Sequence, residues 1–136
     1  MKNSLIILLF ASLSIFSCKK ETEVITPDYS NTVIGNYAVA RLELNGKIAI
    51  LPANGVSAGV SVVIITKNKV KSTLTVQSQT GKVVYNFLAS DLRKDDYGTS
   101  INFENPSLGS YDPTGKKLIL SGITESGETV KIIAYN

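Results

Sequence analysis

The chain has 136 residues with 14 basic and 11 acidic side chains, one cysteine and no histidine. This composition excludes Ser-His-Asp and Cys-His nucleophile arrangements, the common zinc ligand sets and any internal disulfide. The lysines are scattered mostly singly and the net charge is mild, so we expect no nucleic-acid binding, and the length fits a single domain.

The N-terminus has the layout of a secretory signal. Lys2 supplies a positive charge, an apolar run extends over Ser4–Phe16, and small residues precede Cys18. The run is shorter than the roughly 20 apolar residues that a bilayer requires and contains two further serines, so it does not predict a spanning helix. We predict a signal peptide over residues 1–17.

The residues around the cysteine carry a resemblance to a known family. Ile15, Ser17 and Cys18 resemble the lipobox of bacterial lipoproteins, with an aliphatic residue three positions before the cysteine and a small residue directly before it. Phe16 departs from the smaller residue usual in that family. The resemblance implies that Cys18 carries a diacylglycerol and an N-acyl chain, which together give stable anchoring. The alternatives are an ordinary secreted protein whose one cysteine lies near the cleavage site by chance, or a free buried thiol.

A polar, aperiodic stretch over 18–32 follows and is broken by Pro27. It predicts a lipidated flexible tether that spans on the order of 20 Å. No aspartate follows Cys18, and a lysine followed by acidic residues stands next to it. In lipoproteins these features imply the outer membrane, with the periplasmic and cell-surface faces both open.

From residue 33 onward the chain predicts an all-β domain. Short segments rich in Val, Ile, Thr and Tyr are bounded by Gly, Asn, Asp or Pro, and no helical period is present. Asn45-Gly46 is typical of a type I′ hairpin turn, so consecutive strands are expected to be antiparallel neighbours. The predicted strands are 36–44, 47–51, 58–66, 70–78, 82–89, 99–104, 117–121 and 128–135.

Alternation predicts which side chains are buried. Val70, Leu74 and Val76 fall on one face of their strand, and Ile101 and Phe103 do so in theirs. The segment Val60–Ile65 differs because it is apolar on almost every residue. It predicts either a strand covered on both faces, by a loop or by the tether, or one whose outer face meets a partner or a membrane.

About eight short antiparallel strands favour a single up-and-down β-barrel over 33–136, which leaves no free edges. A two-sheet β-sandwich is the alternative. Gly35-Asn36-Tyr37 resembles the Gly-x-Trp opening of lipocalin-like barrels, with Tyr37 in the tryptophan position and Lys131 where an arginine packs across it. The resemblance implies a cup that holds a small apolar ligand.

Few side chains are candidates for chemistry. Asp91, Asp95, Asp96 and Glu104 form the densest carboxylate cluster, which leaves a glycosidase-like pair as a hypothesis. Residues 91–98 lack the ligand spacing of an EF-hand calcium loop and read as a solvated hairpin loop. Residues 105–115 read as an irregular connection that contains a turn at 112–115.

The loops 90–98 and 105–116 are the expected recognition regions, because loops at a barrel rim commonly carry recognition. Tyr97 and Tyr111 within them are expected either to contact a ligand or to cover the barrel mouth. No catalytic, metal-binding or cofactor-binding residue is predicted.

The sequence therefore predicts a lipid-anchored, non-catalytic cell-envelope protein that binds a small apolar ligand. The alternative is a protein-interaction or structural module of an envelope complex, and the third hypothesis is a hydrolase without histidine. A cavity above roughly 300 Å³ favours a ligand carrier. A filled core with an exposed apolar patch favours the interaction module.

Overall fold

A computed structural model describes residues 28–136. The predicted signal peptide, Cys18 and most of the predicted tether lie outside the described residues. The elements are α2 (Ser30–Val33), β1 (Gly35–Leu44), β2 (Lys47–Ile50), β3 (Ser57–Thr66), β4 (Lys69–Ser78), β5 (Gly81–Asn86), β6 (Ser90–Lys94), β7 (Ile101–Glu104), β8 (Leu108–Asp112), β9 (Lys117–Ile123) and β10 (Thr129–Tyr135).

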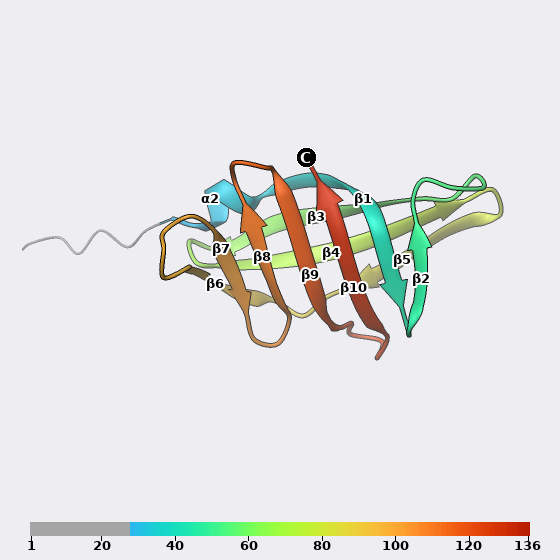
Figure 1. Cartoon of the computed structure of the whole chain (residues 1–136). Coiled ribbons are helices and arrows are strands. Elements are labelled where there is room, and N and C mark those ends of the chain that lie inside the picture. Colours follow the sequence, from blue (N-terminus) through green and yellow to red (C-terminus); the bar gives the residue numbers. More distant parts are fainter. Residues whose placement is uncertain (1–27) are drawn as a thin grey trace, which may run out of the picture.

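Eight of the strands close into an antiparallel barrel in the order β1-β3-β4-β6-β7-β8-β9-β10, and β10 pairs back with β1 (Figure 1). Closure satisfies the backbone groups that an open sheet would leave at its two edges. The prediction of an all-β barrel is confirmed, and the alternative of a two-sheet sandwich is wrong.

The strands that form the barrel differ from those predicted. All eight predicted strands are present, but β2 and β5 lie outside the closed barrel. Their places are taken by β6 and β8, which were predicted as a solvated loop and an irregular connection. In β6 only Ser90 and Leu92 face inward, and the alternate residues are charged, so the segment reads as a loop.

The strand β8 was not predicted from the sequence, in part because it contains Gly109. A Cβ at Gly109 in β8 would lie 2.1 Å from the carbonyl oxygen of Ile119 on β9, so the close approach of the two strands requires glycine there. A short segment of Leu, Gly, Ser, Tyr and Asp has little strand propensity of its own. The neighbouring strands β7 and β9 impose the extended conformation on it.

Two long strands project beyond the barrel and build an arm. β4 pairs with β6 only at Lys69–Val70 and with β5 over Thr73–Ser78, whereas β1 pairs with β3 over its first half and with β2 over its second. We define the arm as β2, the loop 51–56, the outer ends of β3 and β4, and β5. It extends from the barrel opposite α2 (Figure 1).

The turn between β1 and β2 has the predicted geometry. Asn45 has φ 49° and Gly46 has φ 82°, the left-handed values that a type I′ turn requires at both central residues. The two residues therefore reverse the chain directly after β1 and set β2 against it.

The interior of the barrel is filled by large side chains. Alternation predicted this pattern correctly for Val70, Leu74, Ile101 and Phe103, all of which are buried, whereas Val76, predicted on the same face, is only partly buried. The largest side chains that are fully buried are Phe87, Phe103, Leu74, Leu118, Leu120 and Ile132. Burial of apolar surface on this scale is the main source of stability for a small domain.

Tyr37 lies in the interior of the barrel, but its neighbours differ from the one that the lipocalin resemblance implies. Its hydroxyl donates to the carbonyl of Val33 at 2.5 Å, and its ring meets that of Tyr111 edge-on with centroids 5.8 Å apart. Burial, reinforced by Tyr111, raises the pKa of Tyr37 well above its usual value. Lys131 does not pack across Tyr37, because it lies exposed on the outer face opposite Glu43.

Candidate interaction surfaces

Several hollows among residues 28–136 lie on the surface of the barrel and the arm. A hollow of about 10 Å³ lies on the outer face of the barrel, where Arg41 and Glu43 of β1 meet Lys131 of β10, and it is far smaller than the roughly 300 Å³ of a ligand pocket. Larger hollows of about 420 and 450 Å³ are open to solvent. One lies on the arm over 52–57, and the other lies at the opposite end of the barrel.

The arm carries exposed aliphatic side chains on both of its faces and two free strand edges. Ile48, Ile50, Val83 and Val84 keep 46–66% of their surface exposed. Within the described part of the chain, β2 pairs only with β1 and β5 pairs only with β4, so each has one unpaired edge. Such edges are templates for another strand.

The inner face of the arm continues the barrel core. Val56, Ala58, Val76 and Tyr85 are partly buried and pack against the core residues. Val83 lies opposite Val76 in the β4–β5 pairing and extends this apolar face further outward. The barrel therefore has an apolar mouth at the arm end, above the filled interior.

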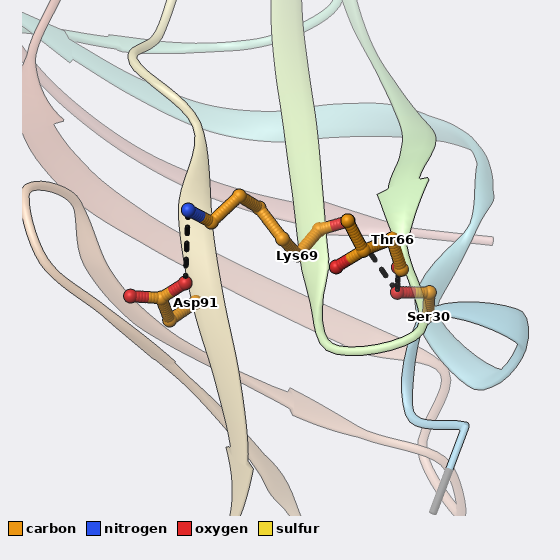
Figure 2. A network of polar contacts seen from close by, with 4 residues as sticks. All are labelled: Ser30, Thr66, Lys69 and Asp91. Carbon is orange, nitrogen blue, oxygen red and sulfur yellow. Dashed lines mark hydrogen bonds and ion pairs between the residues drawn. The ribbon is translucent and has the colours of Figure 1, made fainter. Parts of the chain in front are cut away.

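The opposite end, which we call the base, holds the beginning of the folded chain. Ser30 is buried, and its hydroxyl donates to the carbonyl of Thr66 at 2.5 Å, with the carbonyl of Lys69 at 3.5 Å (Figure 2). Its backbone N–H donates to the carbonyl of Lys67 at 2.9 Å. These contacts fasten α2 to the β3–β4 turn. Residues 29–32, predicted as tether, therefore belong to the packed domain.

Four aliphatic side chains at the base form what we call the base patch: Ile34, Val63, Ile64 and Ile65. They are 36–51% exposed, and the hollow of about 450 Å³ is lined by residues 34–36 and 61–64. The sequence predicted that Val60–Ile65 is either covered or meets a partner or membrane. Val60 and Val62 face the core, Val63 points to the outer face, and Ile64 and Ile65 lie toward the end of β3 beyond these core positions. No described segment covers Val63, Ile64 and Ile65.

Removing the Ser30 hydroxyl tests how firmly the base holds α2. Ser30→Ala leaves the carbonyl of Thr66 without its short hydrogen bond, and we expect a loss of about 1–3 kcal/mol in the free energy of unfolding. Urea denaturation followed by circular dichroism measures it. The control is Asn31→Ala, because that neighbouring side chain is exposed. Equal effects of the two substitutions would contradict this role for Ser30.

The carboxylate cluster is arranged as surface ion pairs and a turn cap. Asp91 lies 3.5 Å from Lys69, and Glu104 lies 2.9 Å from Arg93. Asp95 accepts hydrogen bonds from the N–H and hydroxyl of Thr99. Burial acts to raise the pKa of Asp95, but bonds from Ser100, Thr99 and Gly98 outweigh it and hold the pKa below its usual value.

The structure describes the segment 91–98, for which a solvated hairpin loop was predicted in preference to a calcium loop, and the two tyrosines expected in the loops. Over 28–136 the structure shows no group of three or more His, Cys, Asp or Glu placed to hold a metal ion. Tyr97 stands 90% exposed in the turn after β6. The expectation of a loop position for Tyr111 is wrong, because β8 turns its side chain inward against Tyr37.

The arm is the surface that sequence reasoning missed. The four residues of β2 alternate Lys and Ala with isoleucine, but four residues are too few for a period to show which face is exposed. The base patch could be anticipated from the sequence. The segment 60–65 is apolar on both faces of one strand, which is unusual in a chain whose other strands alternate clearly. The location of both surfaces depends on where β3 and β4 extend past the barrel.

No protein-family model and no curated protein matches the sequence. Among solved structures, a redesigned β-barrel matches with a TM-score of 0.49 and 8% sequence identity, covering 82% of this chain and 96% of that one. In the part of the chain that the structure describes, no helix is long and apolar enough to cross a membrane.

Proposed function

We propose that this chain is a lipid-anchored, non-catalytic protein of the cell envelope, held by Cys18 at the outer membrane, whose barrel presents the arm to a protein partner of an envelope complex. The observation that carries the proposal is a filled barrel beside an arm with exposed aliphatic side chains and unpaired strand edges. Exposed apolar patches of this kind commonly mark interaction sites.

Strand addition is the recognition mode that the arm supports best. An extended segment of a partner could pair with the free edge of β5 or β2 through main-chain hydrogen bonds, with isoleucine and valine side chains providing selectivity. Proteins that avoid such pairing shorten their edge strands or place charges on them. β5 has six residues and a single charged one, Lys82, so its edge is weakly protected.

The proposed anchor joins the barrel at the end opposite the arm. The described chain begins at the base, and the arm extends from the other end of the barrel (Figure 1). An acyl anchor on Cys18 therefore leaves the arm free to meet a partner. The proposal places the domain at the outer membrane, with its face toward the periplasm or the cell exterior.

Native mass spectrometry of the full lipidated protein, gently extracted from its own membranes, tests the proposal. We expect a complex with another polypeptide that is lost in the double variant Ile50→Lys/Val83→Lys. The matched control is Ile123→Lys, because Ile123 is 58% exposed on β9, outside the arm. A monomer without partner, or a complex that survives the double substitution, would contradict the arm as the binding surface.

A small apolar ligand is the second candidate, and the apolar mouth favours it. Because the centre of the barrel is filled, such a ligand would bind against Val56, Ala58, Val76 and Tyr85 at the arm end. The same spectra test this candidate. An adduct of a few hundred daltons beyond the acyl chains, lost in Val76→Asp, supports it, and its absence contradicts it.

A further inference from the structure

We propose that the base patch lies against the lipid surface of the membrane, so that the barrel stands on its base with the arm directed away. This inference rests on the proposed anchoring through Cys18 and adds a defined orientation to it. The occupant of the patch is thus the interfacial region of the bilayer, and neither a second copy nor the chain's own tether.

The path of the chain places the patch close to the anchor. Buried Ser30 is bonded to the β3–β4 turn, so the segment before Asp28 joins the barrel at the base. Residues 19–27 separate Cys18 from Asp28. Fully extended they reach about 30 Å, and as a flexible chain they span roughly 15–18 Å. The base is therefore the end of the barrel held nearest to the lipid.

The chemistry of the patch fits a bilayer interface. Its four side chains are aliphatic and surround the end of β3. Gly35 pairs with Val62 and so brings Ile34 next to Val63, whereas Ile64 lies opposite buried Val70 and therefore points to the inner side at the rim of the barrel. Shallow insertion of apolar side chains among the headgroups is how peripheral proteins gain membrane contact beyond a lipid anchor. The arm has comparable side chains, but it lies at the far end of the barrel from α2, where the described chain begins.

Two lysines near the base patch form ion pairs with carboxylates of the protein. Lys69 lies 3.5 Å from Asp91, and Lys71 lies 2.9 Å from Glu125. Pairing within the protein leaves these two lysines less available to lipid phosphates. We therefore expect docking on zwitterionic as well as on anionic bilayers.

The chain has no tryptophan, so a single introduced indole reports its own surroundings. Ile64→Trp places the indole in the base patch, and Val84→Trp is the matched control on the arm, since the two side chains are 45% and 46% exposed. Each full, lipidated variant is reconstituted into vesicles of phosphatidylethanolamine with and without phosphatidylglycerol, and with or without brominated acyl chains. Val63→Trp is measured in parallel, in case Ile64→Trp does not fold.

The expected result is a blue-shifted emission that brominated lipid quenches roughly two-fold for the base indoles, with no quenching at position 84. Flotation of the vesicles gives the separate readout for the anchor. Variants that float with the vesicles but show no quenching at 63 or 64 would overturn the docking and leave the anchor intact. Failure of every variant to float would instead contradict the lipid anchoring on which the docking rests.

Two further outcomes would identify another occupant and overturn the proposal. A blue shift without quenching, in a protein that chemical cross-linking captures as a dimer, assigns the patch to a second copy. A blue shift without quenching in a monomer that is abolished by Val24→Ser/Ile25→Ser assigns the base patch to the tether. Val24 and Ile25 are the two large apolar residues of the tether.

Discussion

Phe103→Ala is expected to destabilise the barrel by about 3–5 kcal/mol. Phe103 lies on β7 with 1% of its surface exposed, at the centre of the wall formed by β6, β7 and β8. The substitution removes the ring from a core in which rigid neighbouring strands limit collapse, so the cost includes both lost apolar burial and the cavity left behind.

This loss is a large share of the total, because small domains have only about 5–15 kcal/mol of stability. Urea denaturation monitored by circular dichroism measures it. The matched control is Leu108→Ala on the adjacent strand β8, where the leucine is 62% exposed and a change within about 0.5 kcal/mol is expected. If both variants unfold at the same urea concentration, the packing of this wall is not as described.

Cys18→Ala is expected to abolish acyl labelling and to move the protein from the membrane fraction to the soluble fraction. The thiol is the proposed attachment point of the diacylglycerol, and each buried CH₂ of the acyl chains contributes about 0.8 kcal/mol to membrane binding. Three chains therefore hold the protein far more strongly than the four side chains of the base patch could by themselves.

Labelling with a radioactive or clickable fatty acid, followed by membrane fractionation, measures the effect. Ser14→Ala is the control, because it alters the same apolar run and leaves Ile15, Ser17 and Cys18 in place. We expect the control to be labelled and retained as the unsubstituted protein is. An unchanged membrane fraction for Cys18→Ala would show that the chain is held by something other than acylation.

In the proposed arrangement, the arm and the base patch lie at opposite ends of a lipid-anchored barrel. The proposed contact between the base patch and lipid would restrain the rotation of the domain, which a flexible tether alone would not. A restrained domain loses less orientational freedom when the arm binds a partner, so the cost of association is lower. Substitutions in the base patch are accordingly expected to weaken partner binding without touching the arm.

The sequence alone determined the features that depend on local patterns. Alternation over Val70–Val76 and at Ile101 and Phe103 assigned the buried face, because side chains alternate across a strand whatever its neighbours are. Asn45-Gly46 predicted its turn, since few residues adopt positive φ at both positions. The prediction for Cys18 also rests on the sequence alone, as the cysteine lies outside the described residues.

Only the tertiary structure decided which strands close the barrel. β6 and β8 have weak local patterns and are extended because neighbouring strands supply their hydrogen bonds, with Gly109 allowing the close approach of Ile119. Because β3 and β4 are long enough to project beyond the barrel, the strands β2 and β5 lie outside the closed barrel. Tyr111 is buried and Val63–Ile65 exposed for the same reason: burial depends on where strands from distant parts of the chain begin and end against one another, which no local pattern records.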